Sequence, residues 1–224
     1  SSRSSRAPSP SFKQVVITLE LQQAFPLLQQ NVAGSVQWQV PLAPFTTFAI
    51  GGPAAILVEA ATVDDIVTTL HLCRQESLPL FILGAGSNVV IPDSGVPGVV
   101  LRTVPGLNRL ERLGESIVAG AGVTDAALSE FALSCQATGY EWIYDIPGSV
   151  GGAVYMNAGN NYGEMSVVVD EVDWLDSMGK RHTTPLSQLQ FGYRDSRFHH
   201  EPGIILECRM RIPGTDSPDA IRRR

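Results

Sequence analysis

The chain has 224 residues, with 16 Lys or Arg, 22 Asp or Glu and a formal net charge of −6 at pH 7. At about 150 residues per domain, this length fits one large or two small domains, each with a real core. An acidic chain is a poor binder of nucleic-acid phosphates, so we expect no nucleic-acid partner. A composition of 44% hydrophobic and 17% charged residues is typical of a globular protein.

No apolar run approaches the roughly 18 residues that a membrane helix needs, and we expect no membrane partner. Cys73, Cys135 and Cys208 form neither a CxxC pair nor a zinc spacing, and the histidines show no ligand pattern. We therefore predict no metal. An odd number of widely spread cysteines fits a reducing compartment, and the predicted location is cytoplasmic.

Residues 1–19 contain no Asp or Glu, and Ser and Arg make up the first six. A transit-peptide remnant, an expression scar and a disordered tail all fit this composition, and we favour the tail or the scar. Since there is no initiator Met, we expect the chain to be processed or cut. Residues 19–32 predict a first helix with a break at Pro26, and residues 41–52 predict a loop.

Residues 54–60 are apolar and branched, which predicts a strand. Thr62 is the expected N-cap of the following helix, with Asp64 and Asp65 in its first turn. The apolar face of this helix would contain Ile66, Leu70 and Cys73. Residues 80–83 predict the next strand, and the strand–helix–strand order predicts a parallel pair with a right-handed crossover.

Further along, strands and helices continue to mix. We predict a strand at 99–101, a hairpin of 110–113 with 116–119, a helix from the cap Thr124 to about Ala137, an irregular glycine-rich segment at 140–163, a hairpin of 167–175 with 181–184, and a strand at 204–212. The expected core positions of the second helix are Ala127, Phe131 and Cys135. Hairpins beside a strand–helix–strand unit indicate an α+β fold.

The first candidate site is the GxGSN sequence that follows the strand at 80–83. Its residues are Gly84, Ala85, Gly86, Ser87 and Asn88. Glycines allow close backbone approach to a ligand, and successive backbone N–H groups form a nest for an anion such as a pyrophosphate. A simple tight turn explains the same sequence equally well. The third glycine of the Rossmann fingerprint is missing.

Two more segments stand out. Residues 146–159 are rich in glycine and expose backbone to which a flat ligand can bind, although close helix packing is an alternative. Residues 191–196 contain Arg194 beside Asp195. The two residues form either a surface ion pair or part of a site. In a site, the Arg194 guanidinium would bind a carboxylate or an enolate.

Together these segments resemble the family of bacterial UDP-N-acetylenolpyruvoylglucosamine reductases. The resemblance covers about residues 41–212. It is carried in order by Pro44-Phe45-Thr46-Thr47-Phe48-Ala49-Ile50-Gly51-Gly52, Leu83-Gly84-Ala85-Gly86-Ser87-Asn88, Ile146-Pro147-Gly148-Ser149-Val150-Gly151-Gly152-Ala153, Met156-Asn157-Ala158-Gly159 and Tyr193-Arg194-Asp195-Ser196.

The resemblance implies a flavin-binding fold of the vanillyl-alcohol-oxidase type (PCMH type), in which two α+β subdomains hold FAD noncovalently. The subdomains would comprise residues 41–103 and 104–213, after a tail and helix at 1–40 and before a linker at 214–224. By resemblance, the FAD-binding residues are Gly51, Gly52, Gly84, Ala85, Gly86, Ser87, Asn88, Pro147, Gly148, Ser149, Gly151, Gly152, Asn157 and Gly159.

The resemblance also implies a reaction in peptidoglycan precursor synthesis. In the family, NADPH reduces the flavin, which then reduces UDP-N-acetylglucosamine enolpyruvate to UDP-N-acetylmuramate. Arg194 matches the arginine that stabilises the enolate together with a Glu, while a Ser gives the second proton. The motifs of that Ser and Glu lie beyond residue 224 in the family, and neither Ser149 nor Ser196 replaces the donor. We therefore expect this chain alone to be inactive.

Two alternatives remain open. One is a non-catalytic flavin-binding protein of the same fold, and the other is an oxidase of the same superfamily that acts on another substrate. The glycine-rich segments contain no His to which a flavin could be covalently linked, and this absence disfavours the oxidase. The oligomeric state is left open.

Overall fold

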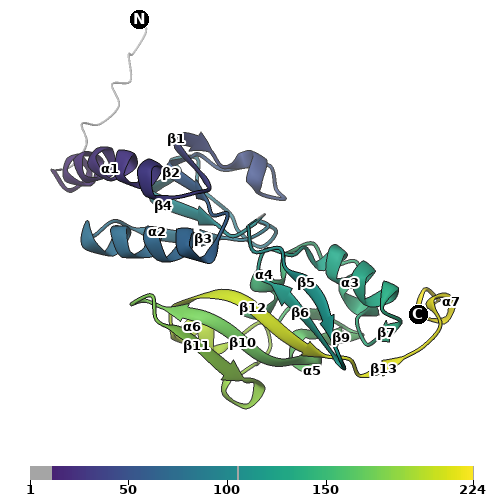
Figure 1. Cartoon of the computed structure of the whole chain (residues 1–224). Coiled ribbons are helices and arrows are strands. Elements are labelled where there is room, and N and C mark those ends of the chain that lie inside the picture. Colours follow the sequence, from purple (N-terminus) through teal and green to yellow (C-terminus); the bar gives the residue numbers. More distant parts are fainter. Residues whose placement is uncertain (1–11, 105, 224) are drawn as a thin grey trace, which may run out of the picture.

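The computed structural model describes residues 12–104 and 106–223. Most of its strands form two sheets, which lie in different parts of the molecule (Figure 1). The first sheet has the order β1-β2-β4-β3 and the second has the order β11-β10-β12-β6-β5. The chain passes from one to the other between β4 (Val96–Arg102) and β5 (Leu110–Leu113). The Ser- and Arg-rich segment at 1–11 lies outside the described residues.

In the first sheet, β4 lies between β2 and β3. β2 (Pro53–Glu59) and β3 (Leu80–Leu83) both pair with β4 in parallel, so the predicted strand–helix–strand unit is parallel but its two strands are not adjacent. The reason is burial, because Val99, Val100 and Leu101 of β4 are fully buried. A strand that is apolar on both faces is most stable between two neighbours.

β1 (Ser35–Pro41) lies antiparallel to β2 at the edge of this sheet. Sequence reasoning missed it, although exposed and half-buried residues alternate along it as in an edge strand. The predicted loop at 41–52 therefore begins one residue later, because Pro41 is the last residue of β1. It also contains the 3-10 turn η1 (Ala43–Phe45).

Two helices, α1 and α2, pack against the first sheet (Figure 1). α2 (Val63–Gln75) begins at the predicted cap, where the Thr62 hydroxyl accepts a hydrogen bond from the Asp65 N–H at 3.1 Å. α1 (Phe12–Asn31) is continuous through Pro26, so the predicted break is wrong. Its buried residues Leu21, Ala24 and Leu28 lie on both sides of the proline, and their packing outweighs one lost backbone hydrogen bond.

The second sheet contains both predicted hairpins. They are β5 with β6 (Ser116–Gly120) and β10 (Val169–Asp176) with β11 (Arg181–Pro185). The last long strand, β12 (Gly203–Arg211), lies between β10 and β6. The short helix α5 (Met165–Val168) takes up the first two residues of the strand predicted at 167–175.

α3 (Asp125–Ser134) begins after the predicted cap Thr124 and ends three residues before Ala137. Its buried face differs from the predicted one. Leu128 and Ala132 are fully buried together with Asp125, whereas the predicted core residues are only half-buried. The helical spacing of the predicted core residues was right, but tertiary packing buries the face one position further along the chain.

The glycine-rich segment contains more regular structure than predicted, including α4 (Val150–Tyr155). The remaining short elements are β7 (Ala137–Thr138), η2 (Glu141–Ile143), β8 (Gly159–Asn160), β9 (Gly163–Glu164), η3 (Leu186–Gln188), α6 (Arg197–His200), β13 (Gly214–Thr215) and α7 (Pro218–Ile221). Within the described ranges, no helix combines the length and the apolarity that crossing a bilayer requires.

Candidate functional site

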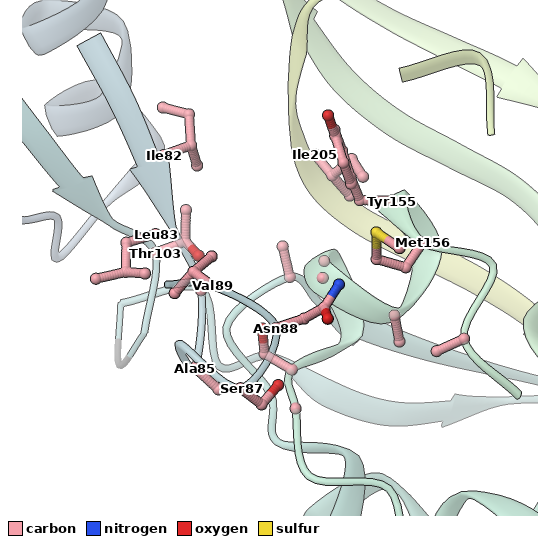
Figure 2. Close-up of a pocket in the computed structure, with 18 of the residues that line it drawn as sticks. Ile82, Leu83, Ala85, Ser87, Asn88, Val89, Thr103, Tyr155, Met156 and Ile205 are labelled. Carbon is pink, nitrogen blue, oxygen red and sulfur yellow. The ribbon is translucent and has the colours of Figure 1, made fainter. Parts of the chain in front are cut away.

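A cavity of about 850 Å³ opens between the two sheets. Its walls come from β3 and the loop that follows it, from the segment at 146–158, and from residues near α6 and β12. Figure 2 shows side chains of both parts facing one another across this space. On one side lie Ile82, Leu83 and Thr103, and on the other Tyr155, Met156 and Ile205.

The GxGSN loop lines the cavity with all five predicted residues, Gly84, Ala85, Gly86, Ser87 and Asn88. Gly86 has φ +72°, and a Cβ there would overlap the Phe45 carbonyl oxygen. The Thr47 N–H donates to the Gly86 carbonyl at 3.1 Å. Glycine is thus required because the segment at 43–47 packs directly onto this loop.

The second glycine-rich segment forms the opposite wall with Pro147, Gly148, Ser149, Gly151 and Gly152. A Cβ on Gly151 would lie only 2.8 Å from the Ala121 Cβ, and the Gly151 N–H donates to the Ala121 carbonyl at 3.0 Å. The interpretation as close helix packing holds here, whereas the binding of a flat ligand stays a prediction. Gly151 allows close packing of α4, and neither Gly151 nor Gly152 places a side chain in the cavity.

Asp125, a residue that sequence reasoning missed, lines the same cavity. Its side chain is 1% exposed, and neither carboxyl oxygen has a hydrogen-bond partner among the described residues. Burial raises the pKa of Asp125 to about 7. The nearby Ser149 hydroxyl, in the same wall, is also buried without a partner there. Buried polar groups of this kind usually have partners, so both point to a ligand.

Arg194 reaches the cavity from a tight turn in which Gly192 and Asp195 exchange backbone hydrogen bonds. Its φ of +54° is strained for a residue with a side chain. The guanidinium donates to the Gly159 carbonyl at 2.6 Å. The Asp195 carboxylate instead pairs with two histidines, at 3.1 Å and 3.0 Å, and not with the arginine.

Asn157 fixes the turn that carries Arg194. Its side chain is 2% exposed, donates to the Gly192 carbonyl at 2.9 Å and accepts from the Ser166 N–H at 3.0 Å.

Four predicted cofactor residues do not line the cavity, namely Gly51, Gly52, Asn157 and Gly159. Gly52 packs against the backbone of residues 92–95 and donates its N–H to the Pro92 carbonyl at 3.0 Å.

Ser196 has a structural role, because its buried hydroxyl donates to the Tyr155 carbonyl at 2.6 Å. This contact links the Arg194 turn to α4. In the described part of the chain there is no group of three or more His, Cys, Asp and Glu side chains suited to a metal ion. The cavity offers instead apolar walls, backbone N–H groups and two orphan polar side chains, a set that suits a large cofactor with an anionic part.

Comparison with known families decides the class of this cofactor. Residues 54–185 match the model of the FAD binding domain. The chain belongs to the FAD binding domain family. The matched range contains both glycine-rich walls of the cavity. FAD is accordingly the cofactor, and the predicted flavin-binding fold is confirmed.

The FAD binding domain has relatives that the sequence motifs already indicated. The chain is 39% identical over 208 residues to a UDP-N-acetylenolpyruvoylglucosamine reductase of Rhodopseudomonas palustris, covering 92% of this chain and 65% of the relative. A reductase of the same name from Clostridium botulinum is 37% identical over 171 residues, 76% of this chain and 56% of the relative. The predicted resemblance is confirmed. The chain spans about 65% of the length of the relative from Rhodopseudomonas palustris.

Solved structures with a similar fold support the same relationship. The UDP-N-acetylenolpyruvylglucosamine reductase (MurB) of Thermus caldophilus matches with a TM-score of 0.73 at 32% identity, covering 85% of this chain and 66% of that one. A BBE-like protein of Physcomitrella patens matches with a TM-score of 0.62 at 16% identity, over 85% and 44% of the two chains. The second likeness concerns the fold alone.

Proposed function

We propose that this chain is the FAD-binding part of an NADPH-dependent reductase that converts UDP-N-acetylglucosamine enolpyruvate to UDP-N-acetylmuramate. The observation that carries the proposal is the placement of Arg194 on the same cavity as both glycine-rich walls. The names of the relatives from Rhodopseudomonas palustris and Thermus caldophilus support the substrate. The reaction belongs to peptidoglycan precursor synthesis.

In this proposal the loop at 84–88 binds the pyrophosphate. Gly84 and Gly86 keep the loop backbone open, and the side chains of Ser87 and Asn88 add hydrogen-bonding groups. The part of the opposite wall at Gly151 and Gly152 covers the flavin half, where the absence of side chains leaves room for a flat ring. The apolar residues facing this wall exclude water.

FAD supplies the hydride chemistry of the reaction when it is bound. The protein must stabilise the negative charge that develops on the enolpyruvyl group. Arg194 fits this role because its guanidinium is a planar, permanently charged fork, and because the Asp195 carboxylate pairs with two histidines and not with Arg194. Asn157 acts as a positioning residue, since it holds the Gly192 carbonyl of the turn.

Absorption spectroscopy gives the first test. The purified chain should carry, or take up on titration, an oxidised flavin that absorbs near about 450 nm. A chain that binds no FAD at any concentration would refute the assignment of the cavity.

Arg194→Ala in the complete enzyme tests the catalytic role. We expect kcat to fall by about 10²-fold or more, the scale of losing one group that stabilises an oxyanion, with FAD content unchanged. Arg194→Lys should restore little, because an ammonium lacks the fork. Loss of flavin with normal turnover per bound flavin would instead make Arg194 a cofactor residue.

A further inference from the structure

Asp125 stands out because the site as described so far gives it no function. It is the first residue of α3, directly after the cap Thr124, and its own N–H donates to the Gly148 carbonyl at 3.2 Å. A carboxyl group at 1% exposure with both oxygens unpartnered among the described residues is unusual. Leaving such a group unsatisfied is costly, so its persistence indicates a partner that arrives with the ligand.

The position of the carboxyl group defines what it can reach. A Cβ on Gly148 would overlap Asp125 Oδ2, and the same point lies 3.6 Å from the Ser87 Oγ. Asp125 Oδ2 and the Ser87 Oγ of the GxGSN loop therefore both lie within 4 Å of one point beside Gly148, at the end of the cavity where the proposed function places the pyrophosphate. A ligand oxygen bound there would lie beside both side chains.

Among the described residues, no cation pairs with Asp125. The other titratable groups of the cavity are Tyr155, Arg194 and His199. The charged groups on α3 itself and on the η2 and α7 segments packed against it are Glu130, Glu141, Asp145, Asp219 and Arg222. Burial is the sole cause of the raised pKa of Asp125, so none of these groups contributes to it.

An ionised Asp125 would be repelled by a pyrophosphate, whereas a protonated one can donate a hydrogen bond to it. We propose that Asp125 binds FAD as a neutral carboxylic acid that donates its O–H to a pyrophosphate oxygen, so that FAD binding takes up a proton. This inference rests on the proposed function for the position of the pyrophosphate. The filled cavity would exclude water and bring negative charge close, and both effects favour the neutral acid further.

The sign of the pH dependence follows. In the ligand-free chain the pKa of Asp125 is about 7, and bound FAD must raise it. Above about pH 7 the carboxyl has to regain a proton before FAD binds, so the dissociation constant should increase by up to about tenfold per pH unit. Below that pH the affinity should be constant. The opposite sign, with tighter binding as the pH rises, would mean an ionised carboxylate.

Titration of the chain with FAD between about pH 5.5 and pH 8.5 tests this, followed by flavin fluorescence. Calorimetry in two buffers of different ionisation enthalpy should show net proton uptake, approaching one proton per FAD. Asp125→Asn can still donate a hydrogen bond and should bind FAD with an affinity that no longer depends on pH. His199→Gln removes the histidine that lines the cavity, leaves Asp125 in place and should keep the wild-type slope.

Each other outcome is decisive. A flat or rising affinity of the wild-type chain, or an unchanged slope in Asp125→Asn, would overturn the inference while FAD binding itself stands. A wild-type chain that binds no FAD would instead refute the proposed function. ADP-ribose contains the same pyrophosphate diester without the flavin, and its affinity should show the same slope. An affinity for ADP-ribose that is independent of pH, beside an affinity for FAD that falls with rising pH, would overturn the contact with the pyrophosphate.

Discussion

Gly86 and Gly114 share a left-handed backbone, with φ +72° and +63°, but their surroundings differ. A Cβ on Gly86 would overlap the Phe45 carbonyl oxygen, whereas a Cβ on Gly114 would have no atom within 4 Å. Comparison of the two therefore separates backbone strain from close packing at the cofactor loop.

Gly86→Ala should lower the affinity for FAD by at least about tenfold, because the loop must move away from the segment at 43–47. Gly114→Ala carries only the strain of its φ, which costs about 1–2 kcal/mol of stability, and should bind FAD normally. Flavin titration and chemical denaturation of both variants measure these effects. Equal loss of FAD in the two variants would contradict the role of the loop.

Asp125 also predicts a pH dependence of folding. Its pKa is raised to about 7 in the folded chain by burial, well above that of an exposed aspartate. The folded state therefore holds the proton more tightly. The stability contributed by this group is full below about pH 4 and is lost as the pH rises towards the folded-state pKa.

Asp125→Asn removes this dependence. Between about pH 4.5 and pH 8, the difference in the free energy of unfolding between the two proteins should shift in favour of Asn by about 1–3 kcal/mol. Urea denaturation without FAD at a series of pH values gives the measurement. Parallel profiles for the two proteins would show that the carboxyl group is not buried as described.

At the scale of elements, Asp65 connects α2 to the start of the first sheet. Its buried carboxylate accepts the N–H groups of Ala33 at 2.7 Å and Gly34 at 3.1 Å, in the connection after α1. It also accepts those of Ala61 at 2.8 Å and Thr62 at 3.1 Å, before α2. One side chain thus satisfies donors from two separate segments.

Asp65→Asn should lower the free energy of unfolding by about 1.5–3 kcal/mol, because charge-assisted hydrogen bonds are lost at a buried position. Thr62→Ala is the matched control. It removes only the helix cap and should cost about 1 kcal/mol. Denaturation midpoints of the two variants give the comparison, and an equal cost would mean that the segment after α1 does not depend on Asp65.

At the scale of the whole molecule, the cavity joins the two sheets, because its walls come from β3 on one side and from α4 and β12 on the other. A cofactor that fills it contacts both. Binding to the folded state alone stabilises a protein by about 2.7 kcal/mol at a ligand concentration 100 times the dissociation constant.

FAD should therefore raise the Tm of the whole chain in a single transition, since both sheets would be stabilised together. Scanning calorimetry with and without FAD measures this, and Gly86→Ala provides the control with reduced binding. A cofactor-induced shift confined to one of two separate transitions would show that the cavity does not couple the sheets.

The sequence by itself determined the local features of this protein. Thr62 and Thr124 are caps because a hydroxyl followed by helix-forming residues satisfies free N–H groups locally. The hairpins and the glycine-rich loops were likewise predictable from short-range patterns. Motif order was enough to indicate the flavin-binding fold and FAD.

Tertiary structure alone decided the long-range features. The central place of β4, the continuity of α1 through Pro26 and the rotated buried face of α3 depend on which apolar surfaces meet, which no local pattern records. Asp125 was missed for the same reason. A helix-start aspartate is usually exposed, and only the approach of Gly148 from a segment more than 20 residues away buries its carboxyl group beside the cofactor loop.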